Sequence, residues 1–115
     1  MLPSPDLLTA ISSPRRCEIL RLVWKAERAA GEIHGAMRDV SFAAVSQHLR
    51  VLSNRGLVRL RREGRQRLYR ADREALAPIG RMLEDMWDNA LWRLKLAAEL
   101  EQARRGPRPR RRKRR

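Results

Sequence analysis

Residues 41–54 carry two rows of side chains that fall on opposite faces if the segment is helical. One row is apolar and recurs at i, i+3, i+7 and i+10: Phe42, Val45, Leu49 and Leu52. The other is small or hydrogen-bonding and recurs at i, i+4, i+7 and i+11: Ala43, Gln47, Arg50 and Asn54. We expect the whole apolar row to be buried and the second row to face outward. Its chemistry fits DNA base edges, because alanine can contact a thymine methyl, glutamine suits adenine, and arginine suits guanine or a phosphate.

The sequence also predicts both ends of this helix. Ser41 is a favourable N-cap, and Gly56 suits the left-handed residue that follows a helix. Leu57 would then contact Leu52, as in a Schellman cap. We therefore expect one helix between Ser41 and Gly56.

Residues on the flanks of the helix could position it against phosphates without reading sequence. Ser46 and His48 are the candidates for this role, and Ala44 leaves room for close approach. The candidate nucleic-acid contacts in the segment are Ser41, Ala43, Ala44, Ser46, Gln47, His48 and Arg50.

After Gly56 the apolar period changes from 3.6 to 2, which indicates a β-hairpin with its turn at Glu63-Gly64-Arg65. Four arginines lie near the turn and could follow the DNA backbone or minor groove: Arg61, Arg62, Arg65 and Arg67. We expect the Tyr69 ring to pack on the base of the hairpin. A phosphate contact from its hydroxyl remains an alternative.

The charge distribution singles out the same region. The formal net charge is +14, and residues 41–70 hold eight arginines against one acid, Glu63. Residues 104–115 hold nine of the 27 basic residues and no acid. Positive charge confined to one internal block and one tail is typical of a polyanion-binding face, whereas a merely solubilising surface would intersperse acids.

The rest of the chain predicts a mainly α fold with one small β-hairpin. Helices are expected over 6–11, 15–24 and 30–37, the second with Ser13 as N-cap and Pro14 at its first position. A long helix is expected from Ile79 to about Glu101. The third and fourth helices form a helix-turn-helix, and the hairpin that follows is its wing.

The chain resembles the ArsR/SmtB family of bacterial winged-helix repressors. The resemblance rests on residues 13–20, on the run Val45-Ser46-Gln47-His48-Leu49-Arg50-Val51-Leu52, and on residues 56–58, 62–65 and 68–69. It covers about Asp6 to Glu101. It implies a winged helix-turn-helix with a long C-terminal dimerisation helix, a homodimer, and binding to an inverted-repeat operator in double-stranded DNA.

The resemblance also implies where the dimer forms, because the family pairs its first and last helices. The interface candidates are Leu7, Leu8, Met82, Met86 and Trp87. The alternative for each is the core of the single chain. We expect residues 1–103 to form the DNA-binding and dimerisation domain and 104–115 to be a disordered basic tail.

Several classes of function have no support in the sequence. The family's metal ligands are missing, because the chain has one cysteine, Cys17, and no histidine after His48. We find no phosphate loop, nucleophile–base pair or cofactor motif, and expect no enzyme. No apolar stretch approaches the ~20 residues of a membrane span, so we expect a cytoplasmic protein.

Two other functions remain open. The chain could be a non-specific nucleic-acid-binding or architectural protein that depends on the basic tail. More remotely, it could be a protein-interaction module that binds an unlike partner through its last helix.

Overall fold

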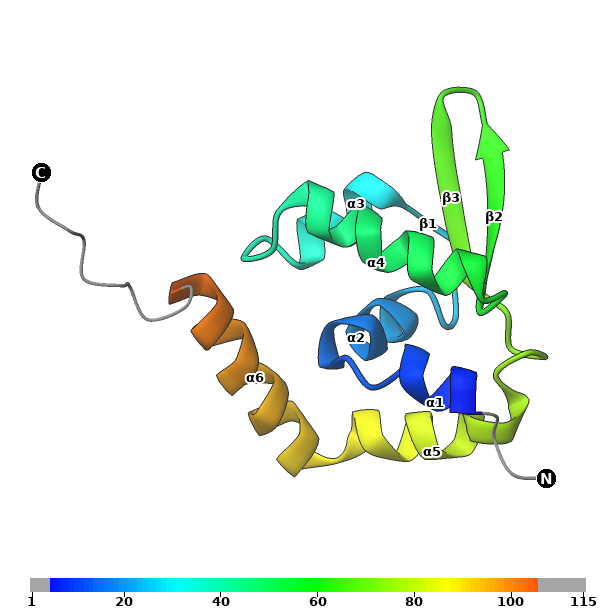
Figure 1. Cartoon of the computed structure of the whole chain (residues 1–115). Coiled ribbons are helices and arrows are strands. Elements are labelled where there is room, and N and C mark those ends of the chain that lie inside the picture. The colour runs from blue at the N-terminus through cyan, green and yellow to red at the C-terminus, as the bar shows by residue number, and fades with distance from the viewer. Residues whose placement is uncertain (1–4, 106–115) are drawn as a thin grey trace, which may run out of the picture.

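The computed structural model describes residues 5–105. In these residues six helices and three strands follow in the order α1-α2-β1-α3-α4-β2-β3-α5-α6 (Figure 1). The fold is mainly α with one small sheet, which includes the predicted hairpin. The helices are α1 (Pro5–Ala10), α2 (Pro14–Leu22), α3 (Ala30–Ala36), α4 (Phe42–Asn54), α5 (Ala77–Asp88) and α6 (Ala90–Arg105). The strands are β1 (Arg28–Ala29), β2 (Val58–Glu63) and β3 (Gln66–Ala71).

Helix α2 lies at the centre, with α4 on one side and α1 and α5 on the other (Figure 1). The Ser13 hydroxyl caps it by accepting from the Arg16 N–H, as predicted. Ile19, Leu20 and Val23 are completely buried, and they share one core with side chains of α3, α4 and α5. The core therefore holds α4 from behind and leaves its other face free.

Both predicted ends of α4 are confirmed. The Ser41 hydroxyl accepts from the Ala44 N–H at 3.0 Å. Gly56 has a φ of +72°, and the Gly56 and Leu57 amides donate to the carbonyls of Ser53 and Leu52 at 3.0 and 2.9 Å. These two bonds are those of a Schellman motif.

The sheet is antiparallel, with strand order β1-β3-β2. The sequence predicts the hairpin β2–β3, whose two-residue turn has Gly64 at a φ of +62°. It does not predict β1, whose two residues pair with Tyr69 and Leu68. The base of the hairpin, away from the turn, is fixed by the Ala71 amide, which donates to the Val23 carbonyl at 3.0 Å.

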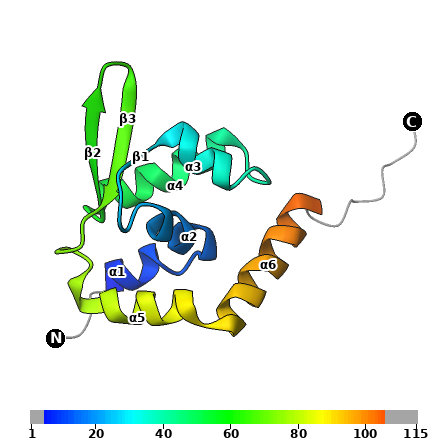
Figure 2. The ribbon, with the colours of Figure 1, turned by 180° about the vertical axis from the view of Figure 1, so that it is seen from behind.

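The predicted long C-terminal helix is wrong, because the chain breaks it at Asn89 (Figure 2). Asn89 is extended, with φ −85° and ψ 126°. Its side-chain oxygen accepts from the Leu91 and Trp92 amides at 2.7 and 3.3 Å and so caps α6. Arg93 then donates to the Trp87 carbonyl at 3.1 Å, which fixes the bend from the other side. The helical spacing of apolar residues continues across Asn89, so this spacing alone does not predict the break.

Two of the predicted interface residues belong to the core of the single chain. Leu7 is 8% exposed and Trp87 is 6% exposed, and the Trp87 ring packs edge-on against Trp24 at 5.1 Å. This burial leaves little of either side chain for a partner. Leu8 and Met82 are 45% and 47% exposed. Met86 is half-buried against the core.

The sequence predicts the boundary between the domain and its basic tail at residue 103. Helix α6 continues through Arg105, two residues past the expected boundary at 103. The remaining residues of that tail, 106–115, lie outside the described residues. Within the described part, no helix has the length and apolar character needed to cross a membrane.

We expect Gly56→Ala to destabilise the fold by about 1 kcal/mol, because alanine disfavours the left-handed backbone. No atom lies within 4 Å of the added Cβ, so the cost is conformational. Gly35→Ala is the matched control, since this exposed helical position has equal space and no positive φ. It should be neutral or stabilising by up to about 1 kcal/mol. Urea unfolding at one protein concentration measures both, and equal effects would contradict the prediction.

We expect Cys17 to resist alkylation in the folded protein. It is 4% exposed, its thiol donates to the Ile11 carbonyl at 3.1 Å, and burial raises its pKa to about 11. At pH 8 only about a thousandth of the thiol is then the reactive thiolate. Mass spectrometry should find slow modification by iodoacetamide in buffer and fast modification in urea. Similar rates in both would show that the site opens readily.

Candidate nucleic-acid interface

The outer ridge of α4 is free, as the sequence predicts. Val45, Leu49 and Leu52 are at most 1% exposed and face the core. The opposite side chains are all exposed: Ala43, Gln47, Arg50 and Asn54. Phe42 departs from the prediction, because it is 48% exposed rather than buried. It lies at the first residue of α4, where the core no longer reaches it.

The flanks of α4 face different neighbours. Ser46 is half-buried on the flank toward the hairpin. His48 is half-buried on the flank toward α2, where its Nδ1 accepts from the Arg16 Nε–H at 3.4 Å. Burial, then Arg16 and Arg15, lower the pKa of His48, so the ring favours its neutral form. Ala44 lies on this same flank and is half-buried.

The turn before α4 is held by an ion pair. Arg15 of α2 donates to the Asp39 carboxylate at 3.1 Å, and their side chains are 13% and 19% exposed. Asp39 lies between α3 and α4. The pair therefore ties the helix-turn-helix to the central helix and sets where the Ser41 end of α4 begins.

Strand register sorts the hairpin arginines into two faces. Residues paired across an antiparallel ladder lie on the same face, and alternate residues along a strand lie on opposite faces. Leu60 pairs with Tyr69 and Arg62 pairs with Arg67, so these four share the face toward α4. Arg61 pairs with Leu68 and lies on the outer face.

Within the described part of the chain, carboxylates neutralise two of the three arginines of the outer face, Arg59 and Arg61 but not Arg70. Arg59 donates to Asp72 at 3.1 Å, and Arg61 donates to Glu27 at 2.6 Å and to Glu63 at 2.9 Å. The hydrogen bond from Arg61 is the main cause of the lowered pKa of Glu27. The hydrogen bonds that Arg61 donates to Glu27 and Glu63, in turn, raise the pKa of Arg61. Arg61 is one of the predicted DNA contacts, and in the structure its guanidinium forms ion pairs with two acids.

The other predicted hairpin arginines keep their charge available. Arg62, Arg65 and Arg67 are exposed, and none forms an ion pair within residues 5–105. Two of them lie on the face toward α4 and Arg65 lies in the turn. Tyr69 is 7% exposed with its ring in the core cluster, as expected from the sequence.

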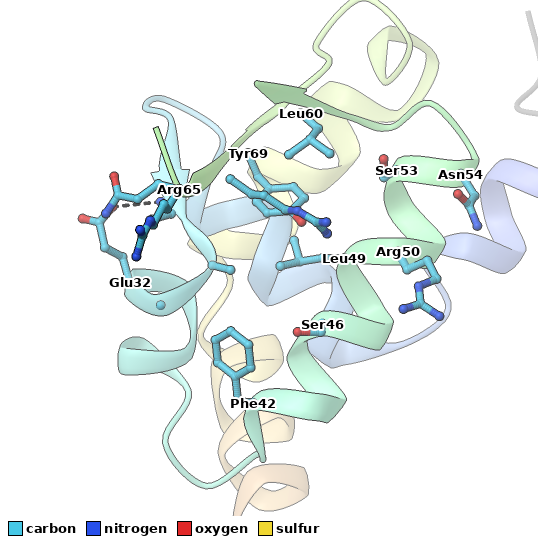
Figure 3. A pocket seen from close by; sticks show the side chains of 15 residues that line it. Glu32, Phe42, Ser46, Leu49, Arg50, Ser53, Asn54, Leu60, Arg65 and Tyr69 are labelled. Atoms are coloured by element: carbon cyan, nitrogen blue, oxygen red, sulfur yellow. Dashed lines mark hydrogen bonds between the residues drawn. The ribbon is translucent and has the colours of Figure 1, made fainter. Parts of the chain in front are cut away.

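A groove of about 680 Å³ separates α4 from the hairpin (Figure 3). The first turn of α3 closes one end, where Glu32 accepts from the Ala29 N–H at 2.8 Å. The groove brings together predicted residues from both elements: Ser46, Arg50, Arg65, Arg67 and Tyr69. It also includes residues that the sequence analysis missed or placed elsewhere: Glu32, Phe42, Ser53 and Leu60. The sequence could have revealed Ser53, because it follows Ser46 by two helical turns and therefore lies on the same flank of α4.

Among the described residues, no three His, Cys, Asp or Glu side chains come together in a way that could hold a metal ion. His34 illustrates this, because its Nε2 is occupied by the Val40 carbonyl at 2.9 Å. The chemistry of the groove and ridge is instead that of hydrogen-bond donors, small apolar groups and unpaired cations. Such a set fits the edges and phosphates of a nucleic acid.

Comparisons with known proteins agree with this geometry. A family model described as bacterial regulatory protein, arsR family, matches residues 13–59. The structure of reduced HlyU from Vibrio cholerae is similar at 33% identity and a TM-score of 0.60, over 70% of this chain and 81% of that chain. A possible transcriptional regulator for arsenical resistance is 33% identical with a TM-score of 0.61, over 82% and 97% of the two chains.

A third similar structure is the homodimeric winged helix-turn-helix DNA-binding domain Mb0332 from Mycobacterium bovis. It is 31% identical with a TM-score of 0.62, over 75% of this chain and 79% of that chain. A search of curated protein sequences gave no significant match. The chain therefore belongs to the ArsR family of bacterial regulatory proteins, and it carries the winged helix-turn-helix DNA-binding domain of a transcriptional regulator rather than an enzyme.

Proposed function

We propose that the chain acts in the cytoplasm as a homodimeric repressor that binds an inverted-repeat operator. Helix α4 enters the major groove and reads bases through Gln47 and Arg50, with Ala43 and Ala44 allowing close approach. Ser41 at its N-cap and Ser46 and His48 on its flanks contact the phosphates on either side of the major groove. The hairpin follows the adjacent backbone through Arg62, Arg65 and Arg67.

One observation carries the proposal: the exposed ridge of α4 lies next to hairpin arginines that form no ion pair within residues 5–105. The exposed ridge of α4 is backed by fully buried residues, so it is rigid as well as free. Of the unpaired hairpin arginines, Arg62 and Arg67 lie on the face toward α4. Arg65 in the turn and Arg67 line the groove. Hydrogen-bonding side chains beside fixed cations suit a duplex, whose base edges are flanked by phosphates.

The homodimer is supported by exposed apolar side chains of α1, α5 and α6. Leu8 and Met82 are half-exposed, and Leu91 and Leu94 of α6 are 74% and 66% exposed. A similar winged helix-turn-helix from Mycobacterium bovis is described as homodimeric. A two-fold dimer presents two copies of α4 in opposite orientations, which match an inverted repeat.

Binding to a selected operator tests the proposal. We expect the protein to bind an operator selected from randomised DNA about a thousandfold more tightly than random duplex, in ~150 mM salt. Deleting residues 106–115 should lower both affinities and keep most of their ratio, because charge alone carries no sequence information. Equal affinity for both duplexes would favour the non-specific alternative, as would loss of all binding on deletion.

Single substitutions should separate the two surfaces. Gln47→Ala and Arg50→Ala should each cost about 1–3 kcal/mol on the operator and relax preference at one base pair. Arg67→Gln should weaken operator and random DNA alike and lower the slope of log K against log salt by about 1.

The matched control is the double variant Glu27→Gln with Arg61→Gln, which removes an ion pair and keeps the net charge. It should leave the salt slope unchanged, because Arg61 is already neutralised. Titrations by fluorescence anisotropy at four salt concentrations measure all variants. A fall in the slope for the double variant as large as that for Arg67→Gln would place the contact surface on the wrong face of the hairpin.

A further inference from the structure

The exposed large apolar side chains of the described residues form two groups. Four belong to α1, α5 and α6: Leu8, Met82, Leu91 and Leu94. The other two, Phe42 and Leu60, line the groove between α4 and the hairpin. The first group lies on the side assigned to the dimer, whereas Phe42 and Leu60 lie on the side assigned to DNA and need a different partner.

Phe42 is fixed in position within the single chain. Its ring meets His34 edge-on, with centroids 5.5 Å apart and planes at 87°. The imidazole is itself held, because its Nε2–H donates to the Val40 carbonyl at 2.9 Å. The α3 side therefore supports the ring, while about half of its surface stays open. Figure 3 shows the ring at the end of the groove formed by the start of α4.

The location of Phe42 on α4 matters as much as its exposure. It is the first residue of the helix, and the N-terminal residues of a recognition helix contact base edges. It lies on the hairpin-side flank with Ser46, whereas Gln47 lies on the outer ridge. A flank residue meets the part of the major groove that is nearest to one strand's backbone.

The main apolar group in the major groove is the C5-methyl of thymine, and phenylalanine is one of the side chains that contacts it. This methyl lies on the backbone side of its base pair. Phenylalanine has no donor or acceptor for a phosphate or another base edge. We propose that Phe42 is a specificity-determining residue that recognises one thymine methyl in each half-site, an inference that rests on the proposed function.

Deoxyuridine provides the test, since it differs from thymidine only by this methyl. In an operator selected from randomised DNA, each thymine is replaced in turn by deoxyuridine, symmetrically in both half-sites. One replacement should weaken binding of the unaltered protein by about fourfold per half-site, the effect of one buried methyl group. No sensitive thymine would overturn the proposal.

The variant Phe42→Ala should bind the thymine and deoxyuridine operators equally at that position. Phe42→Leu should keep part of the difference, because leucine still offers apolar contact. Leu60→Ala is the matched control: it removes the other exposed apolar side chain of the groove, and it should retain the full difference. Thermal unfolding of each variant confirms that it is folded.

A purely structural role, or contact with a sugar, would weaken both operators equally and leave the thymine-to-deoxyuridine ratio of Phe42→Ala as in the unaltered protein. That result overturns the proposal. Failure of the proposed function looks different, because the unaltered protein would then not distinguish the selected operator from random duplex.

Discussion

The relation between α4 and the hairpin depends on one residue, Leu57, whose backbone bonds to both. Its amide donates to the Leu52 carbonyl at 2.9 Å and closes the helix, and its carbonyl accepts from the Asp72 amide at 2.9 Å beyond the end of β3. Its side chain is 4% exposed and anchors the link in the core. The left-handed Gly56 makes this reversal possible, because the chain must leave the helix axis within a single residue. These two bonds join the end of the helix to the base of the hairpin, and the groove lies between the two elements.

The position of this link also determines which hairpin side chains face α4. Because β2 starts directly at Val58 with its side chain inward, alternation decides which arginines face α4 and which face outward. The acids are placed accordingly: Asp72 and Glu27 lie where they neutralise Arg59 and Arg61. The local density of arginine therefore overstates the charge offered to a ligand. Toward α4 the strands of the hairpin present only Arg62 and Arg67, which is fewer cations than the sequence suggests.

The sequence predicted the helix-turn-helix and the hairpin because their signals are local. Ser41 and Gly56 cap their own helix, and each can be recognised from a few neighbouring residues. The features that escaped prediction depend on distant partners or on the extent of the core. Arg61 is neutralised by Glu27, 34 positions away, which no periodicity reveals. Phe42 fits the apolar period of α4, but the period does not tell where the core ends.

The bend at Asn89 also limits how two copies can associate. An unbroken helix with a continuous apolar stripe would favour a long, coiled-coil-like seam. Here α5 and α6 run in different directions, so Met82 and the pair Leu91 and Leu94 cannot share one straight stripe (Figures 1 and 2). The capping bonds of Asn89 and the anchoring of Arg93 make the bend part of the fold rather than a product of association. A partner that covers both patches must therefore contact two helices at an angle rather than one straight stripe.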